Sequence, residues 1–280
     1  LFNQPNTILL DGGMGTMLQA AGMKLGTRPE DLNIENPELI RSIHAKYAAA
    51  GSRVVNANTF GASPHKLADS KYTLEEVITA GIANCKQAVA PYGALVTLDV
   101  GPLGELLEPS GTLAFEDAVA EYGRIVRAGV AAGADILYFE TFTDLYEMKA
   151  ALLAAKENST LPIMASMSFE ANGRTFTGCT VESFAATARG LGANAVGINC
   201  SLGPKEIFPM AKRLAEAVPG DFPVFVKPNA GLPRADGSGY DITPQLYAMQ
   251  MKPYRELHLF AAGGCCGTTP EFIQMLNGVF

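Results

Sequence analysis

Three cysteines are spaced so that they could hold a metal ion together. Cys200 follows the short β-rich run 195–199, and the adjacent pair Cys265-Cys266 lies between glycines after the run 258–262. Adjacent cysteines rarely form an unstrained disulfide. Three thiolates without a fourth cysteine or a histidine nearby describe a zinc site with an open position, which suits a substrate that brings its own sulfur. The alternative is that these cysteines are small buried hydrophobic side chains.

Two carboxylates and a glycine-rich run follow other short apolar runs. Asp11 and Glu140 each end such a run, and either could pair with a substrate ammonium group or cap a neighbouring loop. The run Gly12-Gly13-Met14-Gly15 lacks the G-x-G-x-x-G spacing of a dinucleotide-binding loop. We interpret it as a tight loop whose backbone N–H groups can approach a carboxylate, with a plain turn as the alternative.

The other cysteines and the histidines carry weaker signals. Cys85 lies inside a predicted helix and is expected in the core, and Cys179 lies in a predicted loop. No Ser/His/Asp set is evident around His44, His65 and His258, so we expect packed or solvated roles for all three histidines.

Eight short apolar runs alternate with eight longer helical stretches. The fold that these elements form must bring the candidate cysteines and carboxylates together. Strands that are apolar on both faces are typical of parallel sheets covered by helices. Eight β–α units in series predict a closed (β/α)₈ TIM barrel, with the active site at the carboxyl ends of the strands. An open doubly wound sheet is the alternative. The predicted strands are 7–11, 53–58, 94–99, 135–140, 162–168, 195–199, 223–227 and 258–262. The predicted helices are 37–50, 73–90, 114–132, 144–158, 181–191, 204–217, 243–251 and 269–276.

Composition limits the class of protein. With 280 residues, 48% apolar and 18% charged, the chain suits one such barrel, and no linker divides residues 1–280 into separate domains. The net charge of -7 argues against nucleic acid or an anionic membrane as the main partner. No apolar run reaches the about 18 residues of a membrane span. Without a secretory signal pattern, and with an odd number of cysteines, we expect the cytoplasm. The missing starting Met indicates a chain processed or cut from a longer one.

Five motifs together resemble the homocysteine S-methyltransferase superfamily, and most of all the N-terminal, homocysteine-binding module of cobalamin-dependent methionine synthases. They occur in family order over nearly the whole chain. The combination of the single-cysteine motif with Gly-Gly-Cys-Cys-Gly is specific for the superfamily. The motifs are LDGGMGTML at 10–18, NTF at 58–60, GINCSLGP at 197–204, PNAGLP at 228–233 and GGCCGTTP at 263–270.

The resemblance implies a methyltransferase that holds zinc on Cys200, Cys265 and Cys266. The substrate would be L-homocysteine, whose thiolate takes the open position on zinc and is methylated to methionine. Without substrate, Asn229 is the candidate for the fourth zinc ligand. The substrate-binding residues that the resemblance implies are Asp11 and Glu140 for the amino group, Gly12, Gly13 and Thr59 for the carboxylate, and Asn199.

The resemblance also implies a role in methionine biosynthesis with methylcobalamin as the methyl donor. The family's full enzyme carries folate-binding and cobalamin-binding modules after this one, whereas this sequence has no Asp-x-His-x-x-Gly motif for corrinoid binding. We therefore expect these modules, in the same chain or another, to supply the cobalamin. One alternative is a relative that uses betaine or S-methylmethionine directly. Another is a non-catalytic zinc-bearing barrel that docks partners. A zinc hydrolase is disfavoured, because three thiolates leave zinc little Lewis acidity.

Overall fold

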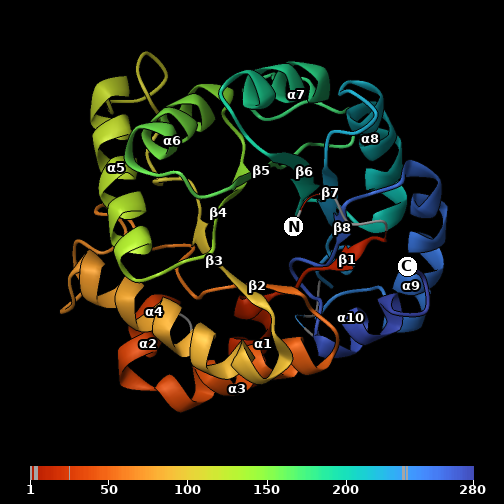
Figure 1. Cartoon of the computed structure of the whole chain (residues 1–280), viewed down its shortest axis with the longest axis horizontal. Helices are drawn as coiled ribbons and strands as arrows, with labels where there is room; N and C mark the ends of the chain where they lie inside the picture. The colour runs from red at the N-terminus through yellow and green to blue at the C-terminus, as the bar shows by residue number, and fades with distance from the viewer. Residues whose placement is uncertain (1, 3–5, 25, 235–236, 238) are drawn as a thin grey trace.

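Eight parallel strands form a ring that is surrounded by helices, as Figure 1 shows. The structure, a computed structural model, describes residues 2, 6–24, 26–234, 237 and 239–280. The strands neighbour one another in the order β1-β8-β7-β6-β5-β4-β3-β2, and a bridge between Leu10 and Val54 closes the ring. The predicted (β/α)₈ barrel is thereby confirmed. The strands are β1 (Ile8–Leu9), β2 (Val54–Asn56), β3 (Leu95–Val100), β4 (Ile136–Phe142), β5 (Ile163–Met167), β6 (Ala195–Asn199), β7 (Val224–Lys227) and β8 (Ala261–Ala262).

Several helices begin at a polar side chain that accepts a hydrogen bond from the first turn. Thr73 accepts a hydrogen bond from the Glu76 backbone, and the Glu76 side chain accepts one in return, which makes a capping box. No helix among the described residues is long and apolar enough to cross a membrane. The α-helices are α1 (Met14–Ala20), α2 (Leu32–Glu35), α3 (Pro37–Ala49), α4 (Leu74–Val89), α5 (Phe115–Ala131), α6 (Leu145–Asn158), α7 (Val181–Gly190), α8 (Pro204–Glu216), α9 (Pro244–Met251) and α10 (Pro270–Leu276). The 3₁₀-helices are η1 (Pro29–Asp31), η2 (Ala90–Tyr92) and η3 (Lys252–Leu257).

All eight predicted strands and all eight predicted helices are present, but two local predictions were wrong. Met14 and Gly15 begin α1, so the predicted tight loop consists of Gly12 and Gly13 followed directly by a helical turn. Burial of Leu18 in the core stabilises this short helix despite its glycine. At the other end of the chain, His258 ends η3 with a φ of 48° and does not begin a strand. The last strand starts at Ala261.

Alternate residues of each strand point into the barrel and form two layers there. The lower layer is apolar and includes Val54, Tyr138 and Phe225. Gly197 leaves room for the Phe225 ring, since a Cβ atom at this glycine would lie 2.5 Å from a ring carbon. Two residues further along the same strands, the inward positions are polar. These upper positions are Asn56, Asp99, Glu140, Asn199 and Lys227. The strand period of two therefore places a polar layer beneath the carboxyl ends of the strands.

Candidate functional site

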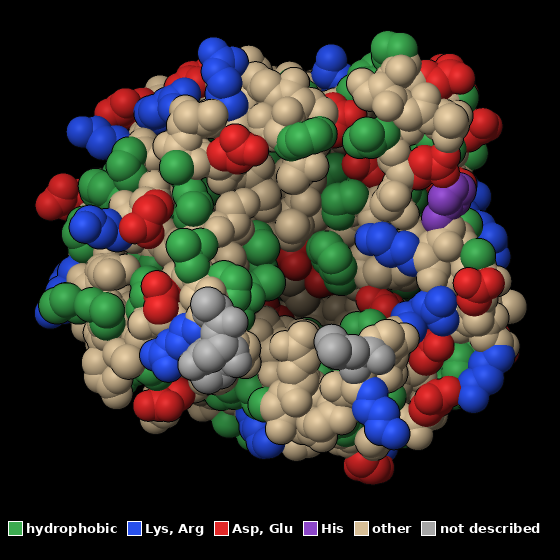
Figure 2. Space-filling model, turned by 180° about the vertical axis from the view of Figure 1, so that it is seen from behind, with side chains coloured by type: hydrophobic (Ala, Val, Ile, Leu, Met, Phe, Trp, Pro, Cys, Tyr) green, Lys and Arg blue, Asp and Glu red, His purple; other side chains and the backbone are tan. Residues whose placement is uncertain are grey.

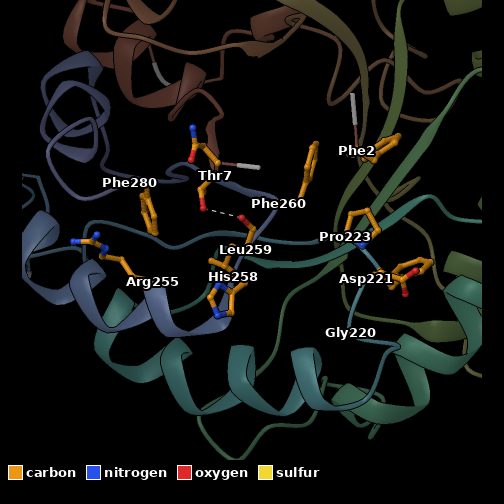
Figure 3. Close-up of a pocket in the computed structure, with 12 residues that line it drawn as sticks. Phe2, Thr7, Gly220, Asp221, Pro223, Arg255, His258, Leu259, Phe260 and Phe280 are labelled. Carbon is orange, nitrogen blue, oxygen red and sulfur yellow. Dashed lines mark hydrogen bonds between the residues drawn. The ribbon is translucent and has the colours of Figure 1, made fainter. Parts of the chain in front are cut away.

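A cavity of about 330 Å³ opens at the carboxyl ends of the strands, where the active site of a (β/α)₈ barrel is expected. Cys200, Cys265 and Cys266 line it together with several carboxylates. Figure 2 shows a hollow in this face, with acidic side chains at its bottom. A second cavity of about 340 Å³ lies beside the amino ends of the strands, among Phe2, Phe260 and neighbouring side chains (Figure 3). The described lining of this second cavity holds no cysteine, so the reactive groups gather in the first.

The three cysteine sulfurs form one compact cluster. They all lie within 4.8 Å of one another, and the Sγ atoms of Cys200 and Cys266 are 3.8 Å apart. A tetrahedral zinc ion with Zn–S distances of about 2.3 Å separates its sulfur ligands by roughly 3.8 Å. The cluster thus has the spacing and the donor atoms that a zinc ion bound by three thiolates requires, and it leaves one position for another ligand.

The end of β7 and the loop that follows it hold the two cysteine-bearing loops in place. The backbone N–H of Cys200 donates to the Lys227 carbonyl oxygen, and that of Cys265 donates to the Pro228 carbonyl oxygen. The backbone N–H of Cys266 donates to Oδ1 of Asn229 at 3.1 Å. Cys200 itself has a φ of 61°, which is unusual for a residue other than glycine and is typical of functional sites. The cysteines are therefore fixed by the backbone before any ligand binds.

The thiols of Cys265 and Cys266 have pKa values shifted in opposite directions. Hydrogen bonds from Cys200 and then from Cys265 lower the pKa of Cys266 to about 3. Hydrogen bonding to Cys200 and to Cys266, followed by burial, raises the pKa of Cys265 well above its usual value. These shifts favour the thiolate form at Cys266 over the other two cysteines, and a thiolate is the form of cysteine that binds metal.

Tyr240 is a neighbour of the cluster that the sequence did not reveal. Its ring packs on the turn after Cys266, since a Cβ atom at Gly267, where φ is 80°, would lie 2.3 Å from the ring. Burial, followed by the charge on Cys266, raises the pKa of Tyr240 to about 12. Tyr240 therefore packs beside the sulfur cluster from the loop between β7 and α9.

A buried lysine sits among the carboxylates of the cavity, and sequence analysis did not single it out. Lys227 Nζ lies 2.8 Å from Asp11 Oδ1 and 3.9 Å from Glu140 Oε2, with all three side chains at most 10% exposed. Burial alone would lower the pKa of Lys227, but the carboxylates of Asp11 and Glu140 raise it above its usual value. The signal in the sequence is a single lysine at the end of an otherwise apolar strand.

Asp11 and Glu140 thus lie in the cavity, as predicted, but their surroundings differ. The second oxygen of Asp11, Oδ2, accepts the backbone N–H of Asn56 at 2.8 Å, so both of its oxygens have partners within the protein. Glu140 lies at a register shift between β4 and β5, followed by Thr141 with a φ of 65°. Burial raises the pKa of Glu140, and Lys227 partly offsets that effect.

The other predicted substrate residues lie in and around the cavity. Gly12 and Gly13 line it, although the Gly13 N–H already donates to Thr268. Thr59 and Asn199 are not among the described lining residues. Thr59 donates to and accepts from the backbone of Asp99. Asn199 Nδ2 donates to Thr141 Oγ1 at 2.7 Å and lies 3.9 Å from Cys265 Sγ. Thr59 and Asn199 therefore contact residues near the cavity through hydrogen bonds. A direct contact of either residue with the substrate stays a prediction.

The remaining cysteines and histidines lie apart from the sulfur cluster. Cys85 is buried in the core, as expected, and Cys179 is half-buried in the loop between β5 and α7. His65 pairs with Glu105 and His258 is exposed. His44 is buried, and neither of its ring nitrogens has a partner among the described residues.

Comparisons with known proteins find a matching family and several similar chains. Residues 8–280 match the family model described as homocysteine S-methyltransferase. The methionine synthases of Mycobacterium tuberculosis and Mycobacterium leprae are each 30% identical to this chain over 94% of its length. The chain spans about a quarter of these relatives, 24% and 23% of their lengths. The homocysteine methyltransferase MmuM from Escherichia coli, in its oxidized form, is 25% identical, with a TM-score of 0.84 over 99% of this chain and 96% of that chain. Its metallated form has the same fold, with a TM-score of 0.83 at 24% identity over 99% of this chain and 96% of that chain.

Proposed function

This chain belongs to the homocysteine S-methyltransferase family, and we propose that residues 1–280 form one barrel domain that methylates L-homocysteine to L-methionine. The observation that carries the proposal is the cluster of three cysteine sulfurs, all within 4.8 Å of one another, at the mouth of a cavity whose other end is lined by carboxylates. A substrate with a sulfur at one end and an ammonium group at the other suits these two ends.

The sulfur end of the cavity would activate the substrate thiol. Cys200, Cys265 and Cys266 would hold zinc, which when bound removes the proton of the incoming thiol and keeps its sulfur nucleophilic. The Tyr240 ring, packed on the turn after Cys266, and the approach of Asn199 to Cys265 would steady the cysteine sulfurs. Asn229 is our candidate for the fourth zinc ligand without substrate, although its Oδ1 already accepts the Cys266 N–H.

The other end of the cavity would orient the amino acid. Buried carboxylates favour an ammonium group there, and Gly12 and Gly13 leave room for the substrate carboxylate. Holding both ends aims the sulfur at the open mouth of the cavity, from which a methyl donor approaches. The sulfur would then attack the methyl carbon, so that the S–C bond forms as the bond between the methyl group and its donor breaks and the donor leaves with the electron pair. Correct positioning would supply much of the rate.

We further propose that the donor is methylcobalamin, carried by another module or chain. The 30% identity to two methionine synthases, of which this chain covers about a quarter, supports this proposal and a partnership with cobalamin-binding and folate-binding modules. The proposed location is the cytoplasm, since the cluster needs reduced thiols. The second candidate is a one-barrel enzyme with a small donor such as S-methylmethionine or betaine. The similarity to MmuM along 96% of that chain favours this candidate.

A donor assay tests the proposal. The zinc-loaded protein is incubated with L-homocysteine and, in separate reactions, methylcobalamin, S-methylmethionine and betaine, and methionine is measured. Methionine formed from methylcobalamin in excess over the other donors supports the first candidate. Methionine from a small donor alone supports the second. No methionine with any donor, in a protein that holds zinc, indicates a non-catalytic barrel.

A further inference from the structure

A chain of buried hydrogen bonds leads from the inside of the barrel to the sulfur cluster. The Tyr138 hydroxyl lies 3.0 Å from Ser166 Oγ, and Ser166 Oγ donates to Oδ1 of Asn199 at 2.8 Å. The three side chains come from the neighbouring strands β4, β5 and β6, and all three are buried. Asn199 ends β6, so the chain of hydrogen bonds stops at the residue directly before the cluster residue Cys200.

The hydrogen-bond partners of Asn199 fix the orientation of its amide group. Its Oδ1 accepts the backbone N–H of Thr141 at 3.0 Å as well as the Ser166 hydroxyl. A backbone N–H can only donate, so the side-chain atom that faces it must be the oxygen, and the other atom must be the nitrogen. The Ser168 hydroxyl holds the backbone of the same residue, since it donates to the Asn199 carbonyl oxygen at 2.8 Å.

The amide nitrogen of Asn199 therefore faces the functional site. Nδ2 donates to Thr141 Oγ1 at 2.7 Å and lies 3.9 Å from Cys265 Sγ and 3.5 Å from Glu140 Oε2. An amide nitrogen carries two hydrogens, so one remains after the bond to Thr141. This second hydrogen is available to the sulfur of the cluster.

Asn199 also joins two residues with an unusual backbone conformation. Thr141 has a φ of 65° and Cys200 has a φ of 61°, values that residues other than glycine rarely adopt. Asn199 is hydrogen-bonded to the first through its side chain and is followed by the second in the sequence. Such conformations persist where the surroundings hold them firmly, and they are common at functional sites.

We propose that Asn199 is a positioning residue for the metal site, which donates its free N–H to the Cys265 sulfur while Ser166 and Tyr138 hold its amide in place. This inference rests on the proposed function and deepens it. Hydrogen bonds from outside the ligand set orient metal ligands and tune their electron donation. A cysteine sulfur that accepts an N–H bond is a weaker nucleophile, so Asn199 favours methylation of the substrate sulfur over methylation of Cys265.

Cobalt-loaded protein tests the role of Asn199, because Co²⁺ bound to thiolates absorbs light through sulfur-to-metal charge transfer. Asn199→Asp keeps the shape of the side chain and an oxygen for Thr141 and Ser166, but it replaces the N–H group near Cys265 by an oxygen. The sulfur-to-cobalt absorption should move to longer wavelength, since a sulfur without this hydrogen bond gives up its electrons more easily. Zn²⁺ binding, measured by competition with a chelator, should weaken by about tenfold to a hundredfold.

Two further variants separate this role from a general effect on the fold. Ser166→Ala removes one support of the amide and leaves its N–H in place, so the absorption should shift in the same direction by a smaller amount. Asn194→Asp makes the same change of amide to carboxylate at the opposite end of β6, where Oδ1 accepts the Ile163 N–H. It should alter neither the cobalt absorption nor the affinity for Zn²⁺.

The outcomes distinguish this inference from the proposed function. Unchanged cobalt absorption in Asn199→Asp overturns the inference, even if the metal-free variant unfolds at lower urea, because the role of Asn199 would then be structural. Should Asn199→Asp fail to fold, unchanged absorption in Ser166→Ala overturns it. If the absorption shifts as expected but the unaltered protein methylates no homocysteine, the role of Asn199 at the metal stands and the proposed function fails.

Discussion

The ammonium group of Lys227 lies 2.8 Å from a carboxylate oxygen of Asp11, inside the barrel, although the two residues are 216 positions apart in the sequence. The pair joins the end of β7 to the residues after β1, on either side of the short strand β8. Both side chains are at most 5% exposed, so solvent does little to screen their attraction.

Removing only the lysine should therefore destabilise the fold. Lys227→Met leaves Asp11 buried without its cation and should lower the free energy of unfolding by about 3–5 kcal/mol. Adding Asp11→Asn to the same chain should restore part of this loss, because no unpaired charge then remains. Urea denaturation of the two single variants and the double variant measures the coupling. Purely additive losses would show that the pair does not act as a unit.

An exposed ion pair provides the matched control. Arg213 and Glu182 approach to 2.7 Å on the surface, where their side chains are 40% and 49% exposed. Arg213→Met should cost about 1 kcal/mol or less, since water and salt screen such pairs.

The three cluster cysteines should each be required for metal retention. We expect one zinc ion per chain after dialysis, and little or none in Cys200→Ala, Cys265→Ala or Cys266→Ala, because two thiolates hold zinc poorly with the fourth position open. Metal analysis with circular dichroism should show folded barrels that lack zinc. Cys179→Ala, outside the cluster, should keep its zinc, and full zinc occupancy in Cys266→Ala would contradict the assignment.

Homocysteine should release close to one proton more than L-norvaline, which has a methyl group in place of the thiol, when each binds at neutral pH. A free thiol with a pKa of about 8.5 is mostly protonated there, and binding to zinc as a thiolate removes that proton. Calorimetry in buffers of different ionisation enthalpy counts the protons. An equal count for the two ligands would mean that the sulfur does not reach the metal as a thiolate.

His44 should make the protein sensitive to acid. Burial lowers its pKa from 6.5 to about 3, so the unfolded chain binds a proton over a pH range in which the folded chain does not. The free energy of unfolding should thus fall as the pH drops from 6.5 to about 3, by about 4 kcal/mol from this residue. His44→Leu should flatten this part of the profile. At pH 7 it should also stabilise the fold by about 1–2 kcal/mol, because two unpartnered ring nitrogens leave the core.

Urea denaturation across this pH range measures both effects of the His44 substitution. His258→Asn is the control, since it removes an exposed histidine and asparagine tolerates the φ of 48° at this position. An unchanged acid slope in His44→Leu would mean that another group governs acid unfolding.

The sequence predicted the barrel well because each strand is a short apolar run with distinct neighbours, as at 195–199. It also predicted which strand ends carry cysteines and acids, since these follow directly from where the runs stop. It did not reveal Asp99, Lys227 or Tyr240 as parts of the site. Their significance lies in distances between residues far apart in the chain, and a lone acid, lysine or tyrosine carries no local pattern. The helix α1 was missed because its glycine resembles a loop, while its stability comes from packing.

The barrel closes between β1 and β2 through few contacts, and side chains make some of them. Beyond the Leu10–Val54 bridge, the carboxylate of Asp11 takes the place of a strand carbonyl and accepts the Asn56 N–H. This seam is where local opening should cost least, and its last hydrogen bond belongs to the substrate cavity. Amide hydrogen exchange at Asn56 would consequently slow when a ligand fills the cavity. Ligand binding would then stabilise the closure of the barrel between β1 and β2.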